Sequence, residues 1–595
     1  MHLLLINKLS IFLDCFIFTH KNKDFPNNHT SFRTFCGDNV ALCIATLKNT
    51  DWSSLLNEPD LDSTFQVFLD NFLRIFESSF PQKTKTYHCS NKNKKWFSNE
   101  LKAHRDTLNL LTTFDKQNPN VNLTRMIKQQ KHLYRAKLNE AKIKFYTNNI
   151  ENNTNKPKII WDIINDTKNK KHNTQSTLSS EEFNKFFVNI PNIISANLQK
   201  SGADPTHTTS KTIHNNHTLF LAPESPEEVK IILRSLSDST AKDIFGLSNK
   251  ILKQLSEGLA LPLSIIINKC FTSGSFPSRL KTSRVIPIFK KGDENDPSNY
   301  RPISLVPVLS KPIEISLNNR LTAFLERSSL LSMHQFGFRK KRSTADALRA
   351  LVGLMVERFE KGESVLAVFC DLSKAFDCVS HQTLLNKLVY YGIRGNSLQI
   401  IKSYLSERFQ LVDLDGVRSE ALPVSAGVPQ GSILGPLLFI LYVNELPSQF
   451  PDLTSVQYAD DTTLLDHNHN TPHLQSVAAS TIKKLHTWFA DSNLCLNLEK
   501  TETGLFSLKE KDEGKYFKFL GVLLDSKLTW KHHITQLTKS LSSILFLLRR
   551  IAHTTPIEVS RTAYMGLFQS KLSYGLILWG NSTDWQKVFV IKKKP

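Results

Sequence analysis

Paired cysteines are missing from this chain of 595 residues. Its eight cysteines include no Cys-x-x-Cys pair, and no Cys/His cluster has the spacing of a zinc site. We therefore expect free thiols in a reducing compartment. Three histidines lie in an Asn-rich stretch, where we interpret them as part of a solvated turn rather than as a metal site: His467, His469 and His473.

Long apolar runs are also missing. The segment from Leu3 to Phe18 is apolar, but Asn7, Lys8 and Asp14 interrupt it. It lacks the charged leading region and the small-residue cleavage site of a signal peptide. We expect a buried strand or helix there, and no membrane partner for the chain.

Acidic residues are the minority charge. The chain has 54 Asp and Glu against 75 Lys and Arg, a formal net charge of +21, which favours a polyanionic partner. Residues 83–171 hold 20 basic and 7 acidic residues and supply most of this excess. Aromatic residues between these charges favour a nucleic-acid-binding surface, whereas a solvated charged face is the alternative.

The order of patterns along the chain indicates several segments. Residues 51–195 are expected to be helical and basic, with apolar residues at helical spacing from Phe65 to Phe76. Residues 196–224 are polar and indicate a linker. A helix is predicted to start at Ser225-Pro226, and mixed strands and helices follow to about 510. Residues 511–595 contain a hairpin-like stretch and an apolar helix, 534–551.

Two aspartate motifs interrupt apolar sequence. Asp460 and Asp461 are adjacent within a strand-like run, and Asp371 ends the apolar run 365–370. Adjacent carboxylates repel each other, and they are costly in a half-buried strand unless a cation lies between them. Carboxylates from a strand end and a hairpin tip can hold two hard cations, the arrangement of a nucleotidyl-transfer site.

Each motif alone has a simpler interpretation. An Asp-Asp pair is most often a solvated turn, and Asp371 is placed where it could cap a helix over the residues that follow. The surrounding sequence decides between these interpretations. Further blocks occur in a fixed order: Val285-Ile286-Pro287-Ile288-Phe289-Lys290-Lys291-Gly292, Asn299-Tyr300-Arg301-Pro302-Ile303-Ser304-Leu305, Gln335-Phe336-Gly337-Phe338-Arg339, Asp371-Leu372-Ser373-Lys374-Ala375-Phe376-Asp377, Gly427-Val428-Pro429-Gln430-Gly431-Ser432, Tyr458-Ala459-Asp460-Asp461, Asn497-Leu498-Glu499-Lys500-Thr501 and Phe519-Leu520-Gly521-Val522.

With these blocks, residues 225–579 resemble the reverse transcriptase of non-LTR (LINE-type) retrotransposons, of the jockey type. The resemblance implies an α+β right-hand polymerase. Fingers and a palm with an antiparallel sheet would occupy residues 225–510. A primer-grip hairpin and a thumb would occupy residues 511–595. The basic helical extension 51–195 would precede this polymerase. It implies synthesis of DNA on an RNA template from dNTPs and a DNA primer or target.

The resemblance assigns the metal ligands. Asp371, Asp460 and Asp461, with the backbone carbonyl of Leu372, are expected to hold two Mg²⁺ ions, or Mn²⁺ in their place. Lys500 is expected near the pyrophosphate as a general acid, with an exposed lysine after a turn as the alternative.

The nucleotide site is assigned in the same way. Phe376 is expected to exclude the ribose 2′-hydroxyl, although a core aromatic is the alternative. Gln430 and Gly431, in a turn whose glycines allow close backbone approach, are expected to contact the nucleotide. Lys290 and Arg301 are expected to neutralise the triphosphate, and Lys290 could equally be solvated.

The hairpin Phe519-Leu520-Gly521 is expected to contact the primer, and the helix after it to follow the duplex through phosphate contacts. Such elements usually carry an endonuclease upstream, so residues 1–50 are expected to be its remnant. No Cys/His knuckle or RNase H carboxylate set follows, so we expect truncation at both ends, with neither endonuclease nor RNase H activity. Nuclear and cytoplasmic localisation follows from the role, and the sequence does not indicate an oligomeric state.

Three rival functions stay open. A group II intron maturase or an RNA-dependent RNA polymerase shares the palm chemistry, but Phe376 argues against ribonucleotide synthesis. A decayed or co-opted copy could bind RNA without catalysis, although its key carboxylates are intact. A simple basic nucleic-acid-binding protein would leave the carboxylates unexplained.

Overall fold

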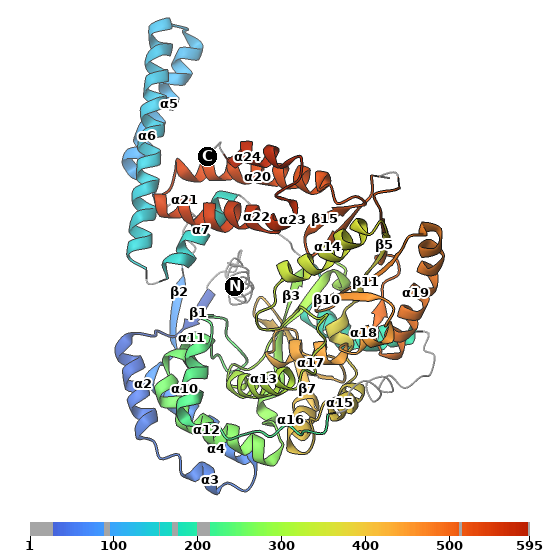
Figure 1. Cartoon of the computed structure of the whole chain (residues 1–595). Helices are drawn as coiled ribbons and strands as arrows, with labels where there is room; N and C mark the ends of the chain where they lie inside the picture. Colours follow the sequence, from blue (N-terminus) through green and yellow to red (C-terminus); the bar gives the residue numbers. More distant parts are fainter. Residues whose placement is uncertain are drawn as a thin grey trace. The chain divides into compact units, whose positions relative to one another are not determined.

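The computed structural model describes residues 28–87, 96–153, 155–168, 176–198, 215–510 and 514–592. The segment 3–18 and much of the predicted linker lie outside these residues. The chain divides into two compact units, each made from two separate stretches: 1–86 with 174–513, and 87–173 with 514–595 (Figure 1). Among the described residues, every helix is too short or too polar to cross a bilayer.

The first unit combines helices with two larger sheets. Its strands are β1 (Asn28–Phe32), β2 (Lys83–Tyr87), β3 (Thr282–Phe289), β4 (Tyr300–Leu305), β5 (Ser364–Cys370), β6 (Leu372–Ser373), β7 (Arg408–Leu414), β8 (Val417–Arg418), β9 (Leu422–Val424), β10 (Thr454–Tyr458), β11 (Asp461–Asn468), β12 (Cys495–Leu496) and β13 (Glu502–Phe506). Its α-helices are α2 (Gly37–Asn49), α3 (Ser54–Asn57), α4 (Leu61–Ser79), α8 (Ser180–Ala196), α10 (Pro226–Ser235), α11 (Asn249–Gln254), α12 (Ser256–Ser273), α13 (Ser310–Arg327), α14 (Thr344–Glu360), α15 (His381–Tyr390), α16 (Asn396–Leu405), α17 (Leu434–Tyr442), α18 (Leu446–Gln449) and α19 (Thr471–Asp491). Its 3₁₀ turns are η1 (Ser278–Leu280), η2 (Pro297–Asn299) and η3 (Ala375–Cys378).

A four-stranded antiparallel sheet lies at the centre of this unit, in the order β10-β11-β5-β13. All seven residues of β5 are buried, which explains its uninterrupted apolar sequence. Helices α14 and α19 pack on this sheet. The mixture of helices with antiparallel sheets confirms the α+β class.

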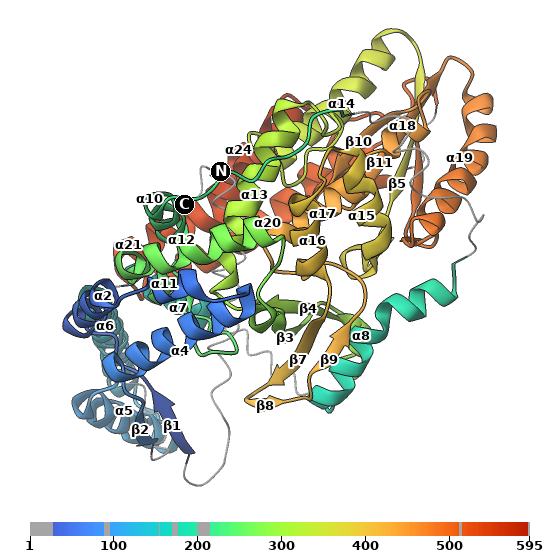
Figure 2. The ribbon, with the colours of Figure 1, turned by 90° about the horizontal axis from the view of Figure 1, so that it is seen from below.

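The second sheet has the order β4-β3-β7-β8, with β9 paired to β7. Strands β3 and β7 are parallel, whereas the other pairs are antiparallel. Helix α8 lies along β7 (Figure 2). The buried amide of Asn184 in α8 donates to the carbonyls of Gln410 (3.3 Å) and Glu420 (2.8 Å), which fixes the helix to the strand edge.

Two helix starts have a capping side chain, and the second of them, at Ser225, confirms the predicted start. Asp60 accepts the Ser63 N–H at 2.8 Å where α4 begins, and the buried face of α4 packs on α12. Ser225 and Glu228 form a capping box at the start of α10, with Pro226 at its first position.

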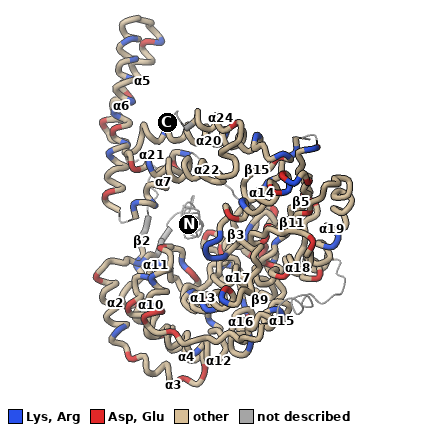
Figure 3. Tube along the Cα trace, viewed as in Figure 1, with Lys and Arg blue, Asp and Glu red and all other residues tan. Residues whose placement is uncertain are grey.

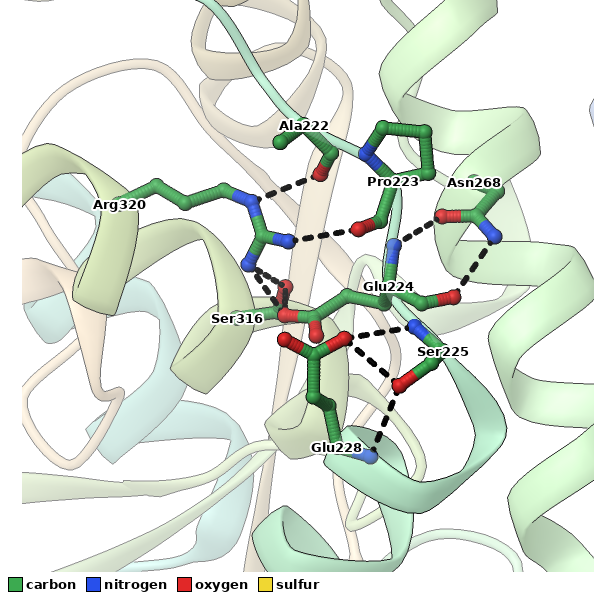
Figure 4. Close-up of polar contacts among 8 residues, drawn as sticks. All are labelled: Ala222, Pro223, Glu224, Ser225, Glu228, Asn268, Ser316 and Arg320. Carbon is green, nitrogen blue, oxygen red and sulfur yellow. Dashed lines mark hydrogen bonds and ion pairs between the residues drawn. The ribbon is translucent and has the colours of Figure 1, made fainter.

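Arg320 on α13 anchors the segment that leads into α10 (Figure 4). Its guanidinium donates to the carbonyls of Ala222 (2.9 Å) and Pro223 (3.2 Å), and it pairs with the buried carboxylate of Glu224. The side chain of Asn268 bonds both the N–H (2.7 Å) and the carbonyl (2.9 Å) of Glu224. This network therefore holds the start of α10 against α12 and α13.

The second unit is mainly helical: α5 (Asn99–Gln117), α6 (Val121–Glu151), α7 (Lys156–Lys168), α20 (Lys531–Ala552), α21 (Ile557–Ala563), a π-helical turn (Tyr564–Gln569), α22 (Ser570–Ser573), α23 (Leu576–Trp579) and α24 (Trp585–Lys592), with the hairpin β14 (Tyr516–Phe519) and β15 (Val522–Asp525). Helices α5 and α6 form a pair, and α7 packs on α20 and α21. A Cβ on Gly566 would lie 2.9 Å from the Trp161 ring, so only glycine allows this contact. The predicted helix 534–551 is confirmed within α20.

Candidate active site

Three carboxylates lie near one another at one end of the central sheet, without converging on a common point. Strand β11 pairs with β5 through Thr462 and Cys370, so the next register position places Asp461 opposite Asp371. Facing residues of an antiparallel pair have side chains on the same side of the sheet. Asp460 lies beside them in the loop between β10 and β11.

The electrostatics of this group reflect its crowding. Loss of hydration, followed by repulsion from Asp460 and Asp371, raises the pKa of Asp461 to about 6, although this side chain still reaches solvent. Loss of hydration and then repulsion from Asp371 also raise the pKa of Asp460, against attraction by Arg301 and Lys290. Asp460 lies in the hairpin turn and Asp461 is exposed, as in a solvated turn, but the repulsion from Asp371 shows that the pair is not isolated.

The backbone beside Asp371 forms another short strand and no helix. The Asn497 N–H donates to the Asp371 carbonyl at 2.9 Å, next to the pairing of β6 with β12. Asp371 therefore does not cap a helix, which removes that alternative. Because Leu372 occupies the following, non-bonded position of the ladder, its carbonyl points away from β12.

Basic side chains surround the carboxylates. The Lys500 ammonium lies 3.7 Å from an Asp371 oxygen, with both side chains largely exposed. Partial burial, then repulsion by Arg301 and Lys500, lowers the pKa of Lys290, while Asp371 opposes this shift. Lys290 directly follows β3, and Arg301 faces Ile288 across the β3–β4 ladder. The structure therefore brings the predicted phosphate-binding residues close to the carboxylates.

The donor set suits a hard divalent cation, because it consists of carboxylate oxygens and a backbone carbonyl. Across the described ranges, however, no three His, Cys, Asp or Glu side chains converge at the spacing of a formed metal site. A cation would therefore have to draw Asp371, Asp460 and Asp461 together. Their negative charge attracts such a cation, which in turn offsets the repulsion between the carboxylates.

Phe376 lies in the turn η3, after β6. Its ring stacks on Phe439 with centroids 4.4 Å apart and meets Phe338 edge-on at 6.2 Å. It is only partly buried, so one side packs on the core while the other stays accessible. This position is compatible with both the nucleotide-gate and the core-aromatic interpretations.

The glycine-rich turn 427–431 packs closely on other backbone. A Cβ on Gly427 would lie 2.6 Å from the Asp377 carbonyl, and one on Gly431 2.5 Å from the Ser304 carbonyl. Both glycines also have positive φ, +84° and +128°. Here the missing side chains allow intramolecular contacts that join this turn to η3 and to β4.

Gln430 makes a contact that the sequence did not indicate. Its amide donates to both carboxylate oxygens of Asp377, at 2.8 and 2.9 Å. Burial raises the pKa of Asp377 to about 6, against these hydrogen bonds and the nearby Lys374. Asp377 ends the sequence block 371–377, and the sequence assigns no function to this residue. Only the fold shows its link to Gln430.

The predicted primer-grip hairpin belongs to the second unit. Leu520 and Gly521 connect β14 to β15 with φ of +44° and +87°, as a two-residue hairpin loop of type I′ requires. The Leu520 carbonyl accepts the Tyr574 hydroxyl at 2.6 Å. The hairpin is thus confirmed, and the primer contacts of Phe519, Leu520 and Gly521 stay predictions.

Residues 288–524 match the family described as "Reverse transcriptase (RNA-dependent DNA polymerase)". The chain is 29% identical over 378 residues to the "RNA-directed DNA polymerase from mobile element jockey" of Drosophila melanogaster, covering 60% of this chain and 40% of that protein. It is 30% identical over 411 residues to the "Probable RNA-directed DNA polymerase from transposon BS" of the same species, covering 63% and 44%.

A third relative, the jockey polymerase of Drosophila funebris, is 31% identical over 338 residues, covering 53% of this chain and 37% of that protein. The chain thus spans less than half the length of these relatives. The predicted resemblance to jockey-like reverse transcriptases is confirmed. The family match lies within the predicted range 225–579 and includes the three carboxylates, Lys500 and the hairpin 519–521.

Proposed function

We propose, from the reverse transcriptase match over residues 288–524, that this chain is an RNA-directed DNA polymerase of a jockey-like non-LTR retrotransposon. The observation that carries the proposal is the juxtaposition of Asp371, Asp460 and Asp461 beside Lys290, Arg301 and Lys500. The reaction adds a dNTP to a DNA primer 3′-end on an RNA template and releases pyrophosphate.

In this proposal the central sheet is the palm, the β3–β4 sheet belongs to the fingers, and α20 with its neighbours forms the thumb. Reverse transcriptase domains use divalent metal ions, and Asp371, Asp460, Asp461 and the Leu372 carbonyl would hold two Mg²⁺ ions. Bound there, such ions neutralise charge on the attacking and leaving oxygens of an in-line displacement.

The remaining residues orient and neutralise the substrate. Arg301 and Lys290 bind the triphosphate, with Arg301 able to contact two oxygens at once. Lys500, whose ammonium lies 3.7 Å from Asp371, donates a proton to the departing pyrophosphate. Phe376 presents its ring edge to the sugar, and Gln430, held by Asp377, supports the nucleotide.

Primer extension on an RNA template tests this function. We expect the wild type to extend a DNA primer with Mg²⁺, and EDTA or the Asp460→Asn/Asp461→Asn variant to abolish the product. Asp466→Asn is the matched control, because Asp466 lies on the same strand and its carboxylate accepts the N–H of the adjacent His467. A wild-type protein without Mg²⁺-dependent extension would contradict the proposal.

The non-catalytic RNA-binding alternative predicts a different result in the same samples. It requires RNA affinity without extension, and equal affinity in the wild type and the Asp460→Asn/Asp461→Asn variant. Filter binding alongside extension therefore separates the two functions. Nuclear and cytoplasmic localisation as a ribonucleoprotein follows as part of the proposal.

The basic helices α5 and α6 are proposed to contribute to nucleic-acid binding. Of the 31 residues of α6, only Ile127 and Ile150 are buried, and Lys and Arg are distributed along both helices together with some Asp and Glu (Figure 3). Lys128, Lys131 and Arg135 follow at helical spacing, and all three are exposed. Such a row suits a phosphate backbone.

A further inference from the structure

The block that contains Gln335 has no role in the proposed function. It nevertheless contacts the β10–β11 hairpin, which carries Asp460 and Asp461. Residues 334–336 run parallel to β10, bridged between Gln335 and Gln457. The Phe336 N–H donates to the Gln457 carbonyl at 2.8 Å, and the Gln457 N–H to the His334 carbonyl at 2.9 Å. This segment thus extends the edge of the sheet beside the Asp460 loop.

The Gln335 side chain binds the backbone of that loop. Its carbonyl oxygen accepts the Ala459 N–H at 3.0 Å and the Gly337 N–H at 2.8 Å, and its amide nitrogen lies 3.4 Å from the Ala459 carbonyl. The residue is 1% exposed, so water cannot replace these contacts without opening the sheet edge. Both polar groups of Ala459 therefore face one carboxamide.

Ala459 needs such support. Its φ is +58°, a left-handed conformation that is unfavourable for a residue with a Cβ. Gly337 makes the close approach possible, because a Cβ there would lie 2.2 Å from the Ala459 nitrogen. The peptide held in this way directly precedes Asp460 and sets the direction in which the chain presents Asp460 and Asp461.

We propose that Gln335 is a positioning residue that locks the Ala459 turn and thereby aims the Asp460 and Asp461 carboxylates at a shared divalent cation. The inference rests on the proposed function, because it assigns a metal-binding task to those carboxylates. Gln335 itself touches neither substrate nor metal. The consequence is that metal affinity and turnover depend on a buried amide behind the site.

Two buried glutamines on neighbouring segments provide the test. Gln335→Met removes the contacts to Ala459 at nearly constant volume. Gln457→Met is the matched control, because Gln457 is fully buried and its side-chain amide has no hydrogen-bonding partner within the described structure. Mn²⁺ binding is titrated by electron paramagnetic resonance without nucleotide, with the Asp460→Asn/Asp461→Asn variant as background.

For Gln335→Met we expect Mn²⁺ affinity and kcat to fall by about tenfold or more, with the KM for dTTP within about twofold of wild type. Gln457→Met should match the wild type in all three. Adding Ala459→Gly to Gln335→Met should restore part of the loss, since glycine adopts positive φ without support. A purely structural role would lower the melting temperature without changing Mn²⁺ affinity in the folded protein.

Equal Mn²⁺ affinity and equal kcat in Gln335→Met and Gln457→Met would overturn the inference while the proposed function stands. Mn²⁺ binding without primer extension in the wild type would overturn the proposed function, and the titration would still decide the role of Gln335. If Gln335→Met does not fold, Gln335→Asn replaces it. That side chain keeps a carboxamide one methylene short of Ala459, and unchanged affinity in it would equally overturn the inference.

Discussion

Asp461 and Asp371 occupy the register position next to Thr462 and Cys370, the last pair of the β11–β5 ladder. Like charges at facing positions of a sheet destabilise it. The Lys500 ammonium, 3.7 Å from Asp371 and largely exposed, offsets this repulsion only in part. The concentrated negative charge therefore destabilises this end of the sheet. Such destabilisation is expected of a cation site before its cation binds.

Asp461→Asn should separate stability from activity. Without metal, we expect the free energy of unfolding to rise by up to about 1 kcal/mol, because the facing repulsion is removed. RNA-templated extension should be lost. Urea denaturation in EDTA and primer extension measure the two effects, and Asp466→Asn should change neither. A less stable but active Asp461→Asn protein would contradict this view of the site.

The stability of the protein should depend on Asp377 between pH 4 and pH 7. Burial raises its pKa from 3.8 to about 6, so the folded state holds the proton more tightly than the unfolded chain. The stability contributed by this group is present below about pH 4 and is lost as the pH rises through 6. Asp377→Asn lacks this titration but retains an acceptor oxygen for Gln430.

We therefore expect the unfolding free energy of Asp377→Asn, minus that of the wild type, to increase by up to about 3 kcal/mol between pH 4 and pH 7. Urea denaturation at intervals of half a pH unit measures the difference. Because both proteins keep all other carboxylates, their difference isolates Asp377. Parallel stability curves would show that this carboxyl has an ordinary pKa.

Phe376→Val should relax sugar selection. Loss of the ring that stacks on Phe439 opens space where a ribose 2′-hydroxyl would lie, and we expect the efficiency of UTP relative to dTTP to rise by at least about tenfold. Primer extension with each nucleotide measures the ratio within one preparation. Phe489→Leu, a buried aromatic change elsewhere in the unit, should leave the ratio unchanged. No gain for UTP would favour the core-aromatic interpretation.

Arg320→Ala should destabilise the first unit. The change leaves the buried Glu224 carboxylate without its cation, and we expect a loss of about 3 kcal/mol or more in unfolding free energy. Arg234→Ala on α10 is the control, because Arg234 pairs with Glu257 at an exposed position and should cost less than about 1 kcal/mol. Chemical denaturation compares the two, and equal losses would mean that the network in Figure 4 adds little.

The triple change Lys128→Ala/Lys131→Ala/Arg135→Ala should weaken RNA binding and reduce the salt slope, log Kd against log salt, by about 2. Fluorescence anisotropy over a salt series measures this slope. The control removes three ion-paired charges from the other unit: Lys230→Ala, Lys253→Ala and Lys361→Ala. Equal slopes in both triple variants would support a solvated charged face on α6.

Local patterns predicted the parts of this fold that depend on neighbouring residues. Ser225 marks a helix start because its capping side chain accepts from backbone only three residues ahead. The carboxylate group was predictable because Asp371 and Asp460 interrupt apolar runs. A carboxylate in such a run requires a neighbouring positive charge, whichever strands pair in the fold.

Contacts between distant segments were not predictable in the same way. The bonds from Gln335 to Ala459 and from Gln430 to Asp377 join residues 124 and 53 positions apart. The sequence around either glutamine does not distinguish a position on the surface from a position in the active site. The helices of residues 51–195 likewise carry no signal that α8 packs on β7 while α7 packs on α20.

The interleaved construction of the second unit has a consequence for biosynthesis. Ile160, Ile163 and Ile164 of α7 are covered within a unit whose other half begins at Gly514, so a ribosome must add hundreds of residues before that cover exists. During this interval the nascent polypeptide exposes the apolar face of α7 to solvent. The order of the helices along the chain therefore leaves an aggregation-prone surface uncovered until translation is nearly complete.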